Sequence, residues 1–110
     1  MGGASNPEAT ARLAQSGPDT LAIAGPLTFA TAARAFEEGG RALIAGTQTR
    51  LDLGGVTRAD SAGLACVLGL AAVASRAGRR IEVLHWPEGL RSLAAVCDVV
   101  ELLDPPAGAN

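Results

Sequence analysis

The stretch from Ser61 to Ser75, SAGLACVLGLAAVAS, carries no charged side chain and constrains the fold more than any other part of the chain. The polar pair Asp60-Ser61 in front of it is typical of a helix start, where a short polar side chain caps free backbone N–H groups. A surface helix usually keeps one polar face, but this one has apolar residues all round. It is too short to span a bilayer, and Gly69 interrupts it. The stretch therefore predicts a helix that is covered on more than one side.

Two apolar faces can be assigned on this helix. One face carries Leu64, Val67, Leu68 and Ala71, and the other carries Cys66, Leu70 and Val73. A domain of 110 residues has a single core, so one face is expected to pack on a sheet. Proteins rarely leave large apolar patches in water, so the other face is expected to meet a protein partner or a second copy of the chain. The alternative is that flanking helices cover it.

Strand and helix patterns alternate along the rest of the chain. Period-two spacing, as in Leu21 and Ile23, indicates strands, and period-3.6 spacing indicates helices. Strands are predicted at 12–16, 19–27, 49–55 and 80–86, and helices at 28–45, at 61–77 and from Pro87 onward. The order β-β-α-β-α-β-α predicts a small α/β domain, with a mixed sheet of about four strands flanked by about three helices.

Several details of these elements can also be predicted. Thr28 is expected to cap the first helix, and Gly39-Gly40 to break it into two pieces. Gly78 is expected to end the long apolar helix. The inward stripe of the first helix is predicted to be Phe29, Ala33, Phe36, Gly40 and Leu43, and that of the last helix Leu90, Leu93, Ala94 and Cys97. The segment VVELL (99–103) reads as a final short strand or a turn.

Composition and charge exclude several classes of function. The formal net charge is −2, and every cation is an arginine, with no basic cluster for binding nucleic acid. Cys66 and Cys97 each lie in an apolar stretch, which favours two buried thiols over a disulfide and hence a reducing compartment. No secretory signal opens the chain, so a cytoplasmic protein is expected. Residues 1–10 and 105–110 have the composition of flexible tails around a domain at 11–104.

Ser61 has two interpretations. As an N-cap, its hydroxyl would accept from the backbone N–H groups at positions 63 or 64. As a contact or modification site, the hydroxyl would be exposed at the helix N-terminus, where a phosphate is favoured by the free N–H groups and the dipole. The two roles are compatible if Asp60 does the capping.

The stretch that begins LDLGGVTRADSAGLACVLG resembles a STAS domain, the fold of sulfate transporters and anti-sigma-factor antagonists. The family pattern is a central strand of the Leu-Asp-Leu type, here residues 51–53, and then Asp-Ser/Thr-x-Gly-Leu at the mouth of a long helix, here residues 60–64. The resemblance covers roughly residues 12 to 104 and implies a STAS-type α/β fold.

Within this family the chain is most similar to the MlaB type, the small accessory subunit of the ABC transporter for phospholipids that maintains outer-membrane lipid asymmetry. Asp60 to Ala65 match the Asp-Thr/Ser-Ala-Gly-Leu-Ala pattern of that type, whereas Ala62 and Ala65 depart from the pattern of the antagonists. The resemblance implies a non-catalytic cytoplasmic subunit, without cofactor or metal, that binds the transporter ATPase and through it the permease. It implies a location peripheral to the inner membrane, with no direct membrane insertion. The partner-binding or regulatory residues are then Asp60, Ser61, Ala62, Gly63, Leu64 and Ala65.

Other functions stay open. The main alternative is an anti-sigma-factor antagonist that binds an anti-sigma-factor kinase and is switched by phosphorylation of Ser61. A small serine hydrolase is more distant, because Ala59 replaces the first glycine of the G-x-S-x-G elbow and His85 is the only histidine. Trp86 is a candidate partner anchor, or it covers the sheet edge beside the last helix. A homodimer also stays open.

Overall fold

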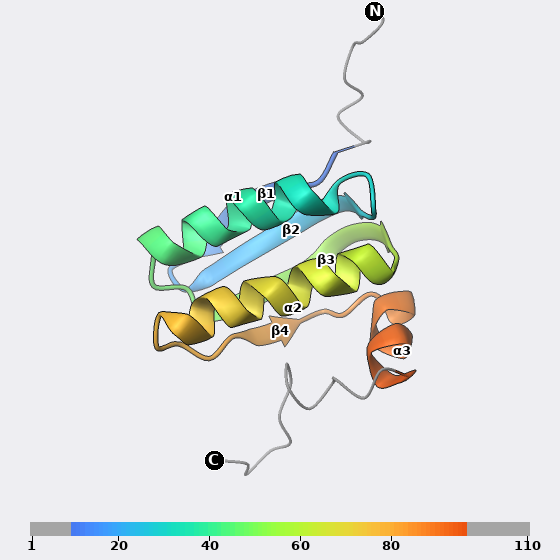
Figure 1. Ribbon diagram of the computed structural model, residues 1–110. Helices are drawn as coiled ribbons and strands as arrows, with labels where there is room; N and C mark the ends of the chain where they lie inside the picture. The colour runs from blue at the N-terminus through green and yellow to red at the C-terminus, as the bar shows by residue number, and fades with distance from the viewer. Residues whose placement is uncertain (1–9, 97–110) are drawn as a thin grey trace, which may run out of the picture.

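The computed structural model describes residues 10–96, which form one mixed four-stranded sheet (Figure 1). The strands are β1 (Arg12–Gly17), β2 (Thr20–Leu27), β3 (Arg50–Ala59) and β4 (Glu82–Leu84), in the spatial order β1-β2-β3-β4. β1 pairs with β2 in an antiparallel hairpin, and β2–β3 and β3–β4 are parallel pairs. The predicted element order and the antiparallel first hairpin are confirmed.

Three helices complete the domain: α1 (Ala32–Ala45), α2 (Ser61–Arg76) and α3 (Glu88–Val96). α1 and α2 lie side by side on one face of the sheet, and both begin at the edge where β2 and β3 end (Figure 1). α3 packs against α2 and β3. None of the helices within residues 10–96 has the length and hydropathy needed to cross a membrane.

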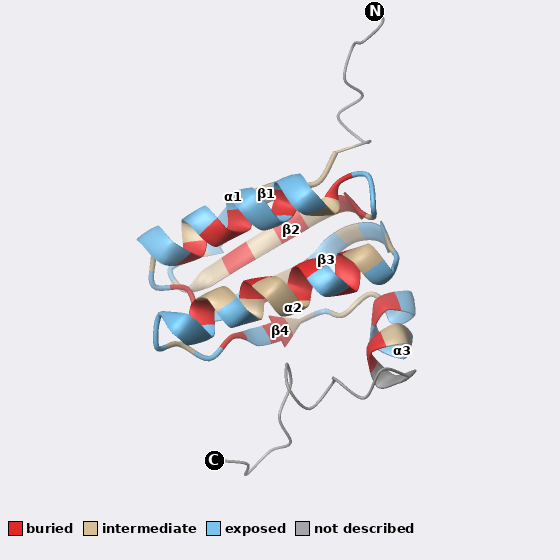
Figure 2. Ribbon diagram, viewed as in Figure 1, coloured by how far each residue is buried: buried red, intermediate tan, exposed pale blue. Residues whose placement is uncertain are grey.

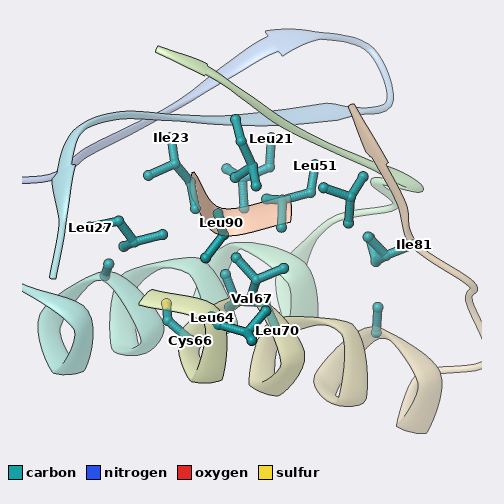
Figure 3. Close-up of a cluster of buried hydrophobic side chains, with 14 of the residues drawn as sticks. Leu21, Ile23, Leu27, Leu51, Leu64, Cys66, Val67, Leu70, Ile81 and Leu90 are labelled. Carbon is teal, nitrogen blue, oxygen red and sulfur yellow. The ribbon is translucent and has the colours of Figure 1, made fainter. Parts of the chain in front are cut away.

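The core lies between the sheet and the two long helices. Leu21, Ile23 and Leu51 point from the strands toward Val67 and Leu70 of α2 (Figure 3). The period-two spacing of β2 thus places its large side chains on the buried face, as predicted. Burying each such side chain stabilises the fold by about 1.5–3 kcal/mol.

Both apolar faces of α2 are largely covered within the domain. Leu64, Val67, Leu70 and Ala74 are buried in the core, and the buried Cys66 lies beside Ala33 and Phe36 of α1. Figure 2 shows buried residues distributed along α2. The expectation that a whole second face needs a partner is therefore wrong, because the neighbouring helices already cover most of it. The exposed residues of α2 have small side chains except at its end: they are Ser61, Ala65, Ala72, Ser75 and Arg76.

The pair Gly39-Gly40 does not break α1, which runs unbroken from Ala32 to Ala45. Both glycines are buried, and a Cβ built on Gly39 would lie 2.9 Å from Leu70 Cδ2 and 3.1 Å from Leu13 Cδ2. The missing side chain lets α1 approach α2 and β1 closely. The predicted break is wrong because this packing between α1, α2 and β1 favours an unbroken helix, and a local sequence pattern does not show it.

Two strands differ in length from the prediction. β3 continues through Gly54-Gly55 to Ala59, because its register with β2 shifts past Ala22 and Gly25 and so absorbs the extra residues. β4 stops at Leu84, because His85 has a φ of 57° and turns the chain away. The predicted strand or turn at 99–103 and the predicted contact of Cys97 lie outside the described residues.

Candidate functional site

The predicted site lies where the parallel strands β2 and β3 end and α1 and α2 begin, at the carboxyl edge of the sheet (Figure 1). In parallel sheets the loops at this edge are the usual place for binding residues, because they are held by rigid elements yet face outward. Here the loop 28–31 follows β2, and Asp60 connects β3 directly to α2.

Asp60 is the N-cap of α2. Its Oδ1 accepts hydrogen bonds from the N–H groups of Ala62 at 2.9 Å and Gly63 at 3.1 Å. Its Oδ2 accepts from the N–H of Phe29 at 3.0 Å, in the loop that follows β2. One carboxylate therefore caps the helix and also ties the two loops of the site together.

The capping by Asp60 leaves the Ser61 hydroxyl exposed and without a hydrogen bond to any residue in the range 10–96. This geometry gives the cap role to Asp60 and not to Ser61, and the role of Ser61 as a contact or modification site stays a prediction. The hydroxyl is available to a partner, and it stands at the positive end of the α2 dipole.

Of the remaining predicted site residues, two are accessible to a partner and two are buried. Ala65 is exposed and Ala62 is half-buried, so the neighbours of Ser61 on α2 are small and another backbone can come close on that side. Gly63 and Leu64 are buried and hold the first turn of α2 against the domain.

The charge of Asp60 is stabilised by the folded structure. The Phe29 N–H, followed by those of Gly63 and Ala62, lowers the pKa of Asp60 below its ordinary value. The pKa of Asp52 is lowered in the same direction, mainly by the N–H of Gly54 and further by His85. A carboxyl whose pKa is lower in the folded chain favours folding above its unfolded pKa of about 4, and this contribution is lost as the pH falls through the folded pKa.

We expect Asp60→Asn to lower stability at neutral pH and to lower it by less as the pH falls, because protonation removes the same charge from the wild type. Urea unfolding midpoints at about pH 7 and about pH 3 measure this change. Asp52 is a second carboxyl whose pKa is lowered, so it also contributes to the loss of stability in acid. Asp52→Asn is the matched variant that measures this second contribution separately from that of Asp60. A gap between wild type and Asp60→Asn that is equal at both pH values would contradict the role of the carboxylate charge.

Phe29 and Phe36 are not on the inward stripe of α1, where the sequence pattern placed them. Phe29 lies before the helix and its side chain is 86% exposed, and Phe36 is 39% exposed. The helix begins late because Thr31, and not Thr28, is its N-cap residue. The Thr31 hydroxyl donates to the Pro26 carbonyl at 2.8 Å and accepts from the Thr28 N–H at 3.0 Å, which fixes the loop.

A shallow apolar groove extends from the site between α1 and α2. The Phe36 ring borders it and lies over Gly69, where an added Cβ would be 2.8 Å from Phe36 Cε1. The groove is lined by Ala32, Ala33, Phe36, Ala62, Ala65, Cys66 and Gly69. Burial raises the pKa of the Cys66 thiol to about 11, so the thiol that lines the groove is protonated at neutral pH.

Trp86 lies apart from the six-residue motif, in the loop between β4 and α3. It is half-buried against the core, and the Arg91 guanidinium lies 5.9 Å from the centre of its ring. The structure therefore gives Trp86 a packing role, and its role as a partner anchor stays a prediction.

The arrangement needed for a serine hydrolase is not formed among the described residues. His85 Nδ1 lies 2.9 Å from Asp52 Oδ1, and no hydrogen bond joins this pair to Ser61. No group of three or more His, Cys, Asp or Glu side chains within residues 10–96 could hold a metal ion.

The four-stranded mixed sheet, the helix order and the Asp-Ser pair at the tip of α2 define a STAS domain. The family described as STAS_2, "Mlab, STAS domain", matches residues 11–104. The chain belongs to this family. Domains of the MlaB type are typically non-catalytic, and the family is one associated with ABC transporters.

Solved structures of other STAS domains share the fold. SpoIIAA in its unphosphorylated form, an anti-sigma-factor antagonist, is 20% identical, with a TM-score of 0.59 over 76% of this chain and 79% of that chain. The phosphorylated form of SpoIIAA, a Bacillus cell fate determinant, is 19% identical, with a TM-score of 0.62 over 79% of this chain and 82% of that one. SLC26A9 is 15% identical, with a TM-score of 0.60 over 74% of this chain but 16% of its own. No curated protein matches the chain.

Proposed function

We propose that this chain is a non-catalytic accessory subunit of an ABC-type phospholipid transporter that maintains outer-membrane lipid asymmetry. It binds the transporter's ATPase subunit, and through it the permease, and it stabilises or regulates that ATPase. The family match over residues 11–104 supports the class of partner. The partner then holds the subunit at the cytoplasmic face of the inner membrane.

The observation that carries this proposal is the free hydroxyl of Ser61. It is exposed at a helix N-terminus that Asp60 caps, and its neighbours Ala62 and Ala65 on α2 are small. A protein surface can approach such a tip without displacing a side chain or breaking a hydrogen bond of the domain. An interface built there needs a close backbone approach, and Ala62 and Ala65 allow one.

Co-purification from the native cytoplasm, with bound proteins identified by mass, tests the proposal. We expect wild type to capture an ABC ATPase and Ser61→Glu to lose it, because a carboxylate buried at the contact without a partner is costly. Ser92→Glu, an exposed serine on α3, is the matched control and should capture the ATPase normally.

Two outcomes would contradict the proposal. Capture of an anti-sigma-factor kinase, with phosphate found on Ser61, would replace the transporter function with that of a switched antagonist. Elution of the wild type as a dimer with no captured ATPase would indicate that the tip is closed by a second copy of the chain.

A further inference from the structure

Phe29 is the most exposed large apolar side chain among residues 10–96. It is 86% exposed, compared with 72% for Ile44 and 39% for Phe36. A phenyl ring left in water forgoes the stabilisation that its burial would contribute. The backbone of Phe29 lies beside the Ser61 tip, since the Phe29 N–H donates to Asp60 Oδ2.

The backbone that carries Phe29 is held in place despite this exposure. Asp60 Oδ2 accepts from the Phe29 N–H at 3.0 Å, and the Thr31 hydroxyl accepts from the Thr28 N–H at 3.0 Å. The Thr28 carbonyl accepts from the N–H groups of Thr31 at 2.9 Å and Ala32 at 2.7 Å. A side chain presented on a fixed backbone loses less entropy on binding than one on a loose loop.

Charge around Phe29 favours a protein pocket over a lipid surface. Membrane-binding apolar side chains usually work with free basic residues. On α1, Arg34 is paired with Glu38 at 3.2 Å and Arg41 with Glu37 at 3.5 Å. Arg58, two residues before Asp60, is exposed and has no ion pair among residues 10–96, and one such cation does not make the basic cluster of a membrane-binding surface. The Asp60 carboxylate accepts hydrogen bonds from three backbone N–H groups within the domain. The tip therefore suits an apolar pocket on a partner better than a positively charged one.

We propose that Phe29 is an anchor residue that enters an apolar pocket on the ATPase subunit, and that Asp60 is the positioning residue that presents it. This inference rests on the proposed function, and it adds the residue that determines affinity and the chemistry of the partner surface. The partner pocket must accept a phenyl ring next to a contact for the Ser61 hydroxyl.

Affinity of the purified ATPase subunit for variants of the full chain tests this inference. We expect Phe29→Ala to weaken binding about 30-fold or more, as truncation of an aromatic anchor does. Ile44→Ala, which removes an exposed apolar side chain at the other end of α1, should change the affinity less than about 3-fold. Both variants should unfold at the wild-type urea concentration, since both side chains are exposed.

A double-mutant cycle tests the role of Asp60. Asp60→Asn keeps one carbonyl oxygen to cap α2, but its amide group cannot accept a hydrogen bond from the Phe29 N–H. If Asp60 acts by presenting Phe29, Asp60→Asn weakens binding of the wild type but has no effect in the Phe29→Ala background. A contribution to folding alone would not depend on the side chain at position 29.

Each result has one meaning. Unchanged ATPase affinity of Phe29→Ala would overturn the inference and leave the proposed function intact, whereas no binding by wild type would overturn the proposed function itself. If Asp60→Asn lowers the affinity for the ATPase equally in the wild type and in Phe29→Ala, the positioning role of Asp60 is overturned. If Phe29→Ala only breaks a homodimer, or only releases the chain from anionic vesicles, the occupant is not the ATPase and the inference fails.

Discussion

Gly63→Ala should destabilise the domain by about 3 kcal/mol or more. A Cβ at this position would overlap with the carbonyl oxygen of Leu27 and would lie 3.3 Å from Ala59 Cβ. Neither neighbour can move easily, because Leu27 and Ala59 are paired partners at the ends of β2 and β3. The first turn of α2 would have to lift away from the sheet, and Leu64 would lose its burial with it.

Urea unfolding followed by the fluorescence of Trp86, the one tryptophan in the chain, measures this loss. Gly89→Ala is the matched control, because it also lies in a helix and a Cβ there meets nothing within 4 Å. It should be neutral or stabilising by up to about 1 kcal/mol, the difference in helix propensity. Equal effects of the two substitutions would show that close contact with Leu27 is not what Gly63 provides.

Ala65→Glu should abolish partner binding without harming the fold. Ala65 is exposed one turn after Ser61 and lines the groove beside Phe36. In the proposed complex a glutamate there would be buried without a partner, so we expect affinity for the ATPase to fall by about 100-fold or more. In the free chain the carboxylate would stand in water, so the free energy of unfolding should change by less than about 0.5 kcal/mol.

Ala72→Glu is the control for this substitution, since Ala72 is exposed further along the same helix, away from the motif. Isothermal titration with the ATPase, together with thermal unfolding of each variant, separates binding from stability. Wild-type affinity of Ala65→Glu would place the interface elsewhere on the domain.

Local chemistry explains what could be predicted from the sequence. The start of α2 at Ser61 follows from the capping ability of Asp60, and its end before Gly78 follows from the left-handed φ of 83° at that glycine. The alternating large side chains of β2 likewise identified its buried face. The six residues of the motif could be located because they lie together in the sequence.

Long-range contacts explain what could not be predicted. The local sequence pattern predicts a helix break at Gly39-Gly40. α1 continues there because Gly39 packs closely against Leu70 and Leu13, which lie far away in the sequence. Phe29 fits the helical spacing of α1, but the hydrogen bonds of Thr31 and Asp60 hold it outside the helix. The bond between Asp60 and Phe29 joins residues 31 positions apart, and no sequence signal marks it.

The two loops at the tip share one carboxylate, and this has a consequence for how such a surface can diverge. A change in the length of the loop after β2 would remove the Phe29 N–H from the reach of Asp60 Oδ2. A substitution of Asp60 could not compensate for that change without cost, because Asp60 also caps α2. We therefore expect the two loops to change together in evolution. New partner preferences would then arise by replacing side chains at fixed backbone positions such as 29, 61 and 65, while insertions between these elements would be selected against.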